Sequence, residues 1–231
     1  MSETAEKQRI VISPSDFAFL WAKDPYGFYE KYRYQIRRPK ANMPYVISEI
    51  DGCMKGSLDG KNLSSLDASL PDCKIILSDS WVQSKPIEVG NIEIVIRGRI
   101  DAALEFNDGS YGVIDYKASN KNGLSMHGYT RQLQGYAYAL MNNDVRDVHL
   151  SPISRLGVLQ YRPNKFCIMG NGKASLEGQI EWIEIDNDIS DFASFLITDI
   201  APFLLQESAE PKGDDPWMNY VNSYHVSEDE Q

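Results

Sequence analysis

The feature that most constrains the fold of this chain is a charged β-hairpin pattern at residues 97–119. Two runs of β-forming residues, RGRIDAALEF and YGVIDYKAS, flank an Asn-Asp-Gly turn signal. Apolar residues precede Asp115 and surround Asp101, which indicates strands inside a sheet. Charged side chains on buried strands need ion-pair partners or a metal ion. The pattern therefore predicts a hairpin that carries a polar site in the middle of a sheet.

The loop length sets how the two carboxylates of this hairpin face each other. A three-residue loop at 107–109 places Asp101 directly opposite Asp115, whereas a two-residue loop shifts the pairing by one residue. In either case the carboxylates are cross-strand neighbours. Directly opposed residues lie roughly 4.5 to 5.5 Å apart at Cβ, where two carboxylates repel unless a cation lies between them. Lys117 shares the face of Asp115 because strand residues alternate. A divalent metal ion between the two carboxylates is the simplest way to relieve their repulsion. The alternative is an exposed hairpin with one polar face.

The segment YTRQLQGYAYALMNN, residues 129–143, predicts a helix next to this hairpin. Leu133, Ala137 and Leu140 recur at helical spacing and form an apolar stripe. Gln132 and Tyr136 are four residues apart and lie on one face beside the stripe. Gln132 is a candidate to hold a metal-bound water or the Asp115 carboxylate, and Tyr136 is a candidate to contact nucleic acid. The alternative is a boundary pair at the edge of a core helix.

The order of the remaining segments predicts a mixed α/β domain around one sheet. Helices are expected from Ser13-Pro14, from Pro25 to about residue 37, and over 45–58. Strands are expected within 74–118, at 155–163 and at 179–185, and a last helix at 189–206 is expected to bend at Pro202. We expect residues 1–207 to form a single domain, followed by a polar, acidic tail at 208–231.

The charge of the chain is uneven. A net charge of −10 argues against nucleic-acid binding through a uniformly basic surface. The segment at 29–40 nevertheless places Lys31, Arg33, Arg37 and Arg38 beside a single Glu, which is compatible with phosphate contacts or with a solvated basic helix face. No run approaches the roughly 18 to 20 apolar residues of a membrane span, and the first residues lack a signal-peptide pattern. We expect a cytoplasmic protein without membrane association.

Three linked motifs give the sequence a family resemblance. Gly98 to Asp101 matches G-x-x-D, Asp115 to Lys117 matches D-x-K, and Gln132 to Tyr136 matches Q-x-x-x-Y, in that order. This combination resembles the PD-(D/E)XK nuclease superfamily, and within it the RecB-like branch that includes the CRISPR-associated adaptation exonucleases. The segment at 12–34 is similar to the opening helix pair of that branch. The resemblance implies a restriction-endonuclease-like core, a central mixed β-sheet flanked by α-helices.

The chain departs from that family pattern at two places. Asp24 stands where relatives with an iron-sulfur cluster have a cysteine, and the C-terminal part has no cysteine group, so no iron-sulfur cluster is expected. Lys55 stands where many relatives have a metal-binding histidine, and a protonated lysine cannot ligate a metal. Glu49 or Asp51 is then the candidate for a further carboxylate ligand from the same helix.

The resemblance implies a metal-dependent nuclease that hydrolyses DNA phosphodiester bonds. Asp101, Asp115 and the backbone carbonyl of Tyr116 are expected to hold Mg²⁺ or Mn²⁺. Lys117 is expected to orient or deprotonate the attacking water and to stabilise the transition state, and Gln132 to fix the site geometry. Candidates for contact with single- or double-stranded DNA are Arg131, Tyr136, Lys31, Arg33, Arg37 and Arg38. Exonuclease action is favoured over endonuclease action, in DNA processing, repair or defence.

The alternative is a non-catalytic nucleic-acid-binding or assembly module with a nuclease fold. The acidic net charge and the missing early histidine favour it. The tail offers Trp217, Tyr220, Val221 and Tyr224 as a surface for a protein partner. The complete set of motifs favours the enzyme, because a binding module has no physical need for two carboxylates facing phosphate.

Overall fold

A seven-stranded mixed sheet organises the computed structural model, which describes residues 7–39, 44–119, 128–144, 148–211 and 217. The strand path is β1-β4-β5-β6-β7, and β2 and β3 also pair with β4. The β1–β4 and β5–β6 pairs are parallel and the others are antiparallel. The strands are β1 (Gln8–Ile12), β2 (Cys73–Gln83), β3 (Ile87–Val89), β4 (Ile92–Phe106), β5 (Tyr111–Ala118), β6 (Ile153–Gly170) and β7 (Lys173–Ile185). The expected α/β class is confirmed.

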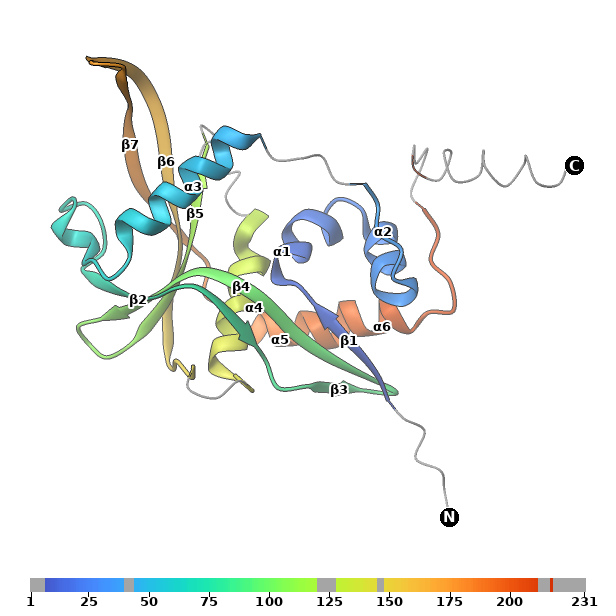
Figure 1. The fold of residues 1–231 in the computed structure, drawn as a ribbon. Helices are drawn as coiled ribbons and strands as arrows, with labels where there is room; N and C mark the ends of the chain where they lie inside the picture. The colour runs from blue at the N-terminus through green and yellow to red at the C-terminus, as the bar shows by residue number, and fades with distance from the viewer. Residues whose placement is uncertain (1–6, 40–43, 120–127, 145–147, 212–216, 218–231) are drawn as a thin grey trace, which may run out of the picture.

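Helices cover both faces of this sheet (Figure 1). They are α1 (Pro14–Asp16), η1 (Phe17–Trp21), α2 (Pro25–Tyr29), η2 (Glu30–Tyr34), α3 (Tyr45–Leu58), η3 (Leu63–Ser65), α4 (Thr130–Met141), α5 (Ile189–Phe195), η5 (Leu196–Ile200) and α6 (Ala201–Leu205). The expected helix over 45–58 is confirmed. The second expected helix ends at Tyr34 and not near residue 37, because Gln35 takes a left-handed backbone conformation with φ of 61°.

Two hydrophobic clusters lie on opposite sides of the sheet. The larger one packs the α4 residues Leu133, Ala137 and Leu140 against β4, β5 and β6, together with the N-terminal and C-terminal helices. The smaller one packs Leu58, at the end of α3, against the other face of the same strands. The end of β5 is therefore sandwiched between α4 and α3.

The β4–β5 hairpin has the three-residue loop that places the two aspartates opposite each other. The Phe106 N–H donates to the Ser110 carbonyl, and Gly109 within the loop has φ of 81°. Ala102 pairs with Ile114, so the next position in this register sets Asp101 opposite Asp115. The β4–β5 pairing ends at Ala102 and Ile114, so the Asp101 backbone lies outside this pairing.

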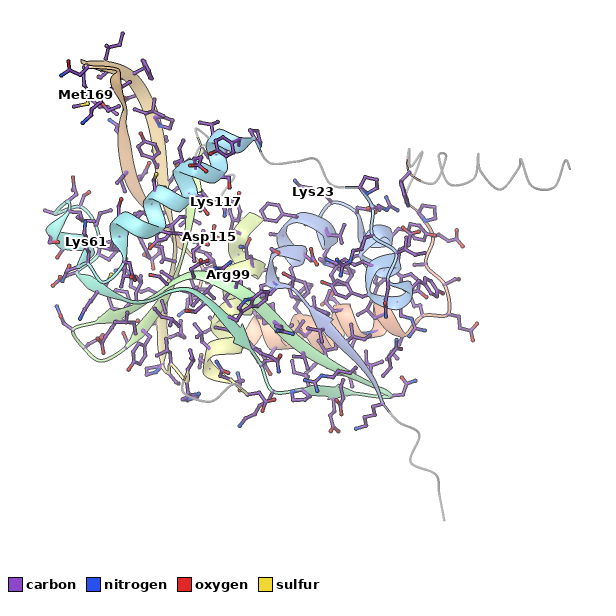
Figure 2. The ribbon with its side chains drawn as sticks, in the orientation of Figure 1. Lys23, Lys61, Arg99, Asp115, Lys117 and Met169 are labelled. Carbon is purple, nitrogen blue, oxygen red and sulfur yellow. The ribbon has the colours of Figure 1, made fainter. Side chains whose placement is uncertain are left out.

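Two features of the sheet differ from the expectation. Strand β1 was not predicted, because its partner β4 lies more than 80 residues away in the sequence. Strands β6 and β7 are much longer than predicted and form a hairpin that projects from the body, with Met169 at its tip (Figures 1 and 2). Glycines at the tip, Gly170 and Gly172, adopt positive φ and close the turn.

No helix in the described ranges is long and apolar enough to cross a membrane. The division between a domain at 1–207 and a tail stays a prediction. The side chains proposed for a partner, Tyr220, Val221 and Tyr224, lie outside the described residues.

Candidate active site

Asp115 is the buried centre of the site. It lies on β5, and its side chain is 6% exposed. Lys117, two residues later on the same strand face, places Nζ 2.5 Å from Asp115 Oδ2. From α4, the side-chain amide of Gln132 donates to Asp115 Oδ1 at 3.0 Å. The structure thus brings together the D-x-K lysine and the helix glutamine around one carboxylate (Figure 2 labels Asp115 and Lys117).

Burial and the neighbouring Asp101 carboxylate favour a cation next to the Asp115 carboxylate. Burial raises the pKa of Asp115 to about 6; the Lys117 ammonium acts to lower it, and the nearby Asp101 carboxylate raises it further. Burial acts to lower the pKa of Lys117, but Asp115 outweighs it and the pKa of Lys117 lies above its ordinary value. Lys117 is therefore an ammonium ion at neutral pH.

Asp101 sits where the regular alternation of β4 breaks. Ile100 belongs to the larger hydrophobic cluster and Ala102 to the smaller one, although residues two apart on a regular strand share a face. The irregularity lets Asp101 Oδ2 accept a hydrogen bond of 2.8 Å from the backbone N–H of Tyr116. The peptide that follows Asp115 is thereby tied to Asp101.

Lys55 of α3 supplies a cation on the other side of Asp101. Its Nζ lies 2.8 Å from Asp101 Oδ1 and 2.9 Å from Asp51 Oδ2. Asp51 and Lys55 are one helical turn apart and lie on the same face of α3. The residue at the expected histidine position therefore reaches the site as an ion-pair partner of Asp101.

Glu49 does not reach the site. It lines a largely apolar groove of about 680 Å³ between α3 and the β6–β7 hairpin, together with side chains such as Phe166 and Ile180. Glu49 and Asp51 are two residues apart on a helix, about 200° around its axis, so only one of them can face β4. Of the two proposed carboxylates, the structure brings Asp51 close and leaves Glu49 on the opposite side of α3.

The close packing around Gly98 explains why the G-x-x-D motif begins with a glycine. A Cβ at this position would lie 2.8 Å from Tyr136 Cε1 and 2.9 Å from Pro14 Cδ. The absence of a side chain lets Tyr136 of α4 lie directly on the β4 backbone. Tyr136 is 6% exposed, and burial first, with the charge of Asp115 second, raises its pKa.

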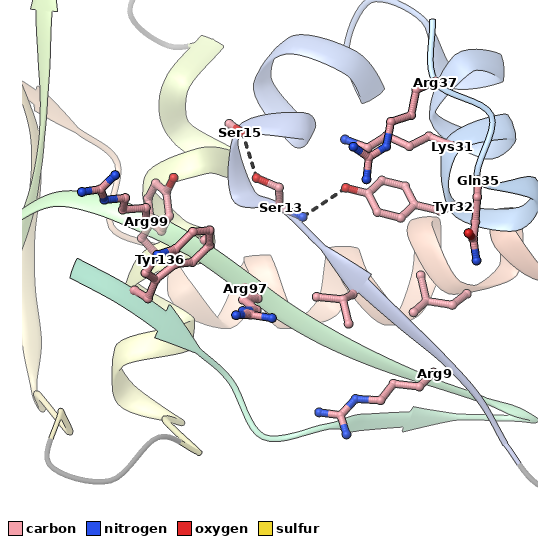
Figure 3. A pocket seen from close by; sticks show the side chains of 14 residues that line it. Arg9, Ser13, Ser15, Lys31, Tyr32, Gln35, Arg37, Arg97, Arg99 and Tyr136 are labelled. Atoms are coloured by element: carbon pink, nitrogen blue, oxygen red, sulfur yellow. Dashed lines mark hydrogen bonds between the residues drawn. The ribbon is translucent and has the colours of Figure 1, made fainter. Parts of the chain in front are cut away.

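A basic groove of about 940 Å³ opens next to Gly98 and Tyr136 (Figure 3). It lies between β1, β2, β4 and the N-terminal helices. Its lining comprises Arg9, Ile10, Val11, Ser13, Ser15, Lys31, Tyr32, Gln35, Arg37, Trp81, Arg97, Gly98, Arg99 and Tyr136. We name it the basic groove. Five of these side chains are Lys or Arg, none is acidic, and the exposed Trp81 ring lies 5.2 Å from the Arg97 guanidinium.

Sequence reasoning missed Arg9, Arg97 and Arg99 as groove residues. The alternation Arg-Gly-Arg just before Asp101 was a visible signal, because it places two arginines on one strand face. Arg9 could not be associated with them without the β1–β4 pairing.

The predicted nucleic-acid contacts divide into two groups. Lys31, Arg37 and Tyr136 line the basic groove, and Lys31 is also paired with Asp16. The others make contacts within the protein. Arg33 donates to Gln8, Arg38 pairs with Asp24 and Glu30, and Arg131 pairs with Asp191 and lies over the Phe195 ring.

Comparison with known proteins identifies the family. The family model of the PD-(D/E)XK nuclease superfamily matches residues 72–192, just over half of the chain. The chain belongs to the PD-(D/E)XK nuclease superfamily. No curated protein matches. The crystal structure of SSO0001 is similar at 15% sequence identity, with a TM-score of 0.49, and the match covers 92% of this chain and 82% of that one.

Membership in the PD-(D/E)XK superfamily implies a nuclease-type hydrolase, and such nucleases usually use divalent metal ions. The polar atoms around Asp115 fit one. Asp101 and Asp115 are adjacent carboxylates, and Gln132 Oε1 beside them is buried with no hydrogen-bond donor in the described part of the chain. A hard divalent cation takes such oxygen ligands and keeps several waters. No group of three or more histidine, cysteine or acidic side chains able to hold a metal occurs within the described ranges.

Proposed function

We propose that this protein is a metal-dependent nuclease of the RecB-like branch that hydrolyses phosphodiester bonds in DNA. The observation that carries the proposal is the convergence of the two carboxylates, Lys117 and Gln132 at the end of β5. Superfamily membership supports hydrolysis of nucleic acid. The helix glutamine on Asp115 supports the RecB-like assignment, because it gives the Q-x-x-x-Y motif a defined contact.

Asp101, Asp115 and the backbone carbonyl of Tyr116 are the groups that would hold Mg²⁺ or Mn²⁺. When bound, such an ion lowers the pKa of a coordinated water and neutralises charge on the phosphate. The Tyr116 N–H fixes Asp101 Oδ2, and Gln132 fixes Asp115 Oδ1, so both carboxylates are oriented before any ligand arrives.

Lys117 acts through its charge. The Asp115 charge holds the pKa of Lys117 above its ordinary value, so Lys117 is an ammonium ion that can donate a hydrogen bond to the reacting phosphate. The Tyr129 ring, 5.2 Å from Nζ, helps hold the ammonium in place. A positioned cation stabilises the negative charge that develops on phosphate oxygens in the transition state. Both roles expected for Lys117, on the attacking water and on the transition state, stay part of the proposal, because a divalent ion bound at Asp115 would offset the charge that raises the pKa of Lys117.

The basic groove supports DNA as the substrate. Its arginines supply the positive charge that phosphates require although the whole chain carries −10. The exposed Trp81 ring supplies an aromatic face on which a base can stack. Gly98 and Tyr136 line the groove, and Gly98 lies three residues before Asp101 on β4, so a strand bound there passes close to the strand segment that carries this carboxylate.

Cleavage assays on labelled DNA test the proposal. We expect linear single- or double-stranded DNA to be cut with Mg²⁺ or Mn²⁺ and to stay intact in EDTA. Exonuclease action predicts that circular DNA of the same sequence resists. DNA binding without cleavage under every metal condition would instead support the non-catalytic module.

Neutralising the groove is expected to weaken DNA binding in a salt-dependent way. In the double variant Arg97→Gln, Arg99→Gln, the slope of log affinity against log salt should fall by roughly 1.4 to 1.8, since each lost phosphate contact contributes about 0.7 to 0.9. Fluorescence anisotropy in EDTA over a salt series measures this slope without cleavage.

The matched control for this experiment is Lys61→Gln, Lys74→Gln, which removes the same charge from exposed positions outside the groove. Equal slopes for the two double variants would show that net charge, and not the groove, governs DNA binding.

A further inference from the structure

The outer part of the β6–β7 hairpin extends beyond the sheet as a two-stranded ribbon (Figure 1). Strand β5 ends at Ala118, which pairs with Tyr161 of β6, so the next residues of β6 pair only with β7. We call residues 162–179 the ribbon and residues 163–176 the outer ribbon. A pair of strands without a third strand buries little of its own surface, so its side chains are available to a partner.

The outer ribbon combines exposed apolar side chains with positive charge. Ile168 is 84% exposed and Met169 is 68% exposed. The outer ribbon contains Lys165 and Lys173 and no acidic residue, although the whole chain carries −10. Lys165 lies 3.6 Å from Glu177, and both side chains are mostly exposed, so this ion pair is weak. The outer ribbon is therefore complementary to an anionic partner that also offers apolar contacts.

The remaining apolar side chains of the ribbon face α3. Phe166 and Leu176 line the apolar groove between α3 and the hairpin, together with α3 side chains such as Ile50. Ile168 and Met169 do not line that groove and lie farther out on the ribbon. The apolar tip is thus directed at something other than α3.

The ribbon stands beside the candidate active site, on the side away from the basic groove. In the strand order β1-β4-β5-β6-β7, β5 carries Asp115 and Lys117 and lies between β4, which lines the groove, and β6. Lys117 is the register partner of Gln160, just before the ribbon begins. The nine residues from Gln160 to Met169 span roughly 30 Å at about 3.3 Å each. Figure 2 shows Met169 at the far end of the ribbon and Asp115 and Lys117 near its base.

We propose that the ribbon is a DNA-binding arm that contacts duplex DNA about nine base pairs from the bond to be cut, since base pairs rise about 3.4 Å each. The inference rests on the proposed function and names a duplex next to the cut as the substrate. The major groove of DNA accepts a two-stranded β-ribbon. In it, Lys165 and Lys173 contact phosphates, and Ile168 and Met169 contact apolar base edges such as the thymine methyl group.

The place of the ribbon favours DNA over a membrane or a second copy of this chain. A substrate that enters along the basic groove and passes Lys117 reaches β6 and then the base of the ribbon, because β5 lies between the two. Two positively charged surfaces then hold the same DNA on either side of the carboxylates. Neither a membrane nor a second copy requires the arm to stand at the active site.

Binding to DNA hairpins with stems of about 6 and about 20 base pairs tests the inference, because a short stem in the basic groove cannot reach the outer ribbon. Fluorescence anisotropy in EDTA measures affinity without cleavage. In the double variant Lys165→Gln, Lys173→Gln, the slope of log affinity against log salt is expected to fall by roughly 1.8 on the long stem, about 0.9 for each lost phosphate contact, and to stay unchanged on the short stem. The charge control Lys61→Gln, Lys74→Gln is expected to match the wild type on both stems.

Ile168→Ser tests the apolar contact of the tip. It is expected to weaken binding of the long stem by roughly tenfold and to leave binding of the short stem unchanged. Ile197→Ser makes the same change at a position on η5 that is 49% exposed, and is expected to match the wild type on both stems. Circular dichroism checks that each variant folds.

The same loss on both stems, or no loss on either, overturns the arm. Binding of wild type but not of Ile168→Ser to phosphatidylserine vesicles, without an effect on the long stem, assigns the tip to a membrane. A dimer that Ile168→Ser loses in analytical ultracentrifugation, again without an effect on the long stem, assigns it to a second copy. Either result overturns the inference. Single-stranded DNA is expected to be cut at the wild-type rate by the ribbon variants. Absence of cleavage in every protein and metal condition overturns the proposed function, while the comparison of stems still decides the arm.

Discussion

Replacing Asp115 by asparagine is expected to abolish DNA cleavage, with a loss of at least about 10³-fold in kcat. The amide has nearly the same shape as the carboxylate but no charge, so it cannot hold a divalent ion beside Asp101. Loss of the metal removes both the activated water and the neutralisation of phosphate charge. Because Asp115 is buried and its pKa is raised to about 6, a neutral side chain is tolerated there and the fold is expected to survive.

Single-turnover cleavage with saturating Mn²⁺ measures the effect, and circular dichroism checks the fold. Glu105→Gln is the matched control, because it removes one carboxylate from an exposed position on the same hairpin. It is expected to cleave at the wild-type rate. Activity of Asp115→Asn within tenfold of wild type would remove Asp115 from the metal site.

The core of this site could be predicted because it is local in sequence. Asp101, Asp115 and Lys117 lie on one hairpin, where strand alternation and loop length determine which side chains meet. The contact between Gln132 and Asp115 joins the hairpin to the helix that follows it, and helical periodicity placed Gln132 beside the buried stripe of α4. These are short-range relations that periodicity encodes.

The parts that could not be predicted depend on contacts between distant segments. The groove arginines on β1 and β4 meet because residues 8–12 pair with residues 92–96, and nothing in the five residues QRIVI specifies that partner. The side of α3 that faces the sheet is likewise set by tertiary packing. From the sequence, Glu49 and Asp51 were equal candidates for a carboxylate at the site. The burial of Leu58 against the sheet turns the side of α3 that carries Asp51 toward the site.

Replacing Lys117 by methionine is expected to separate catalysis from metal binding. The variant should lose about 10²- to 10³-fold in kcat, the usual effect of removing one positioned group that stabilises transition-state charge. Its Mn²⁺ affinity should be unchanged or tighter, because Lys117 is not a ligand and its ammonium, 2.5 Å from Asp115 Oδ2, competes with any cation there. Asp115→Asn, by contrast, should lose both properties.

Measuring both cleavage and Mn²⁺ affinity in Asp115→Asn and Lys117→Met assigns a role to each of these two residues of the D-x-K motif. Lys74→Met, at an exposed position on β2, controls for the loss of one positive charge and is expected to keep the wild-type kcat. If Lys117→Met lost Mn²⁺ binding together with cleavage, the ammonium would be needed to hold the carboxylates in place, and its role would be structural. Retained binding with lost cleavage means that Lys117 acts on the reacting groups and not on the metal.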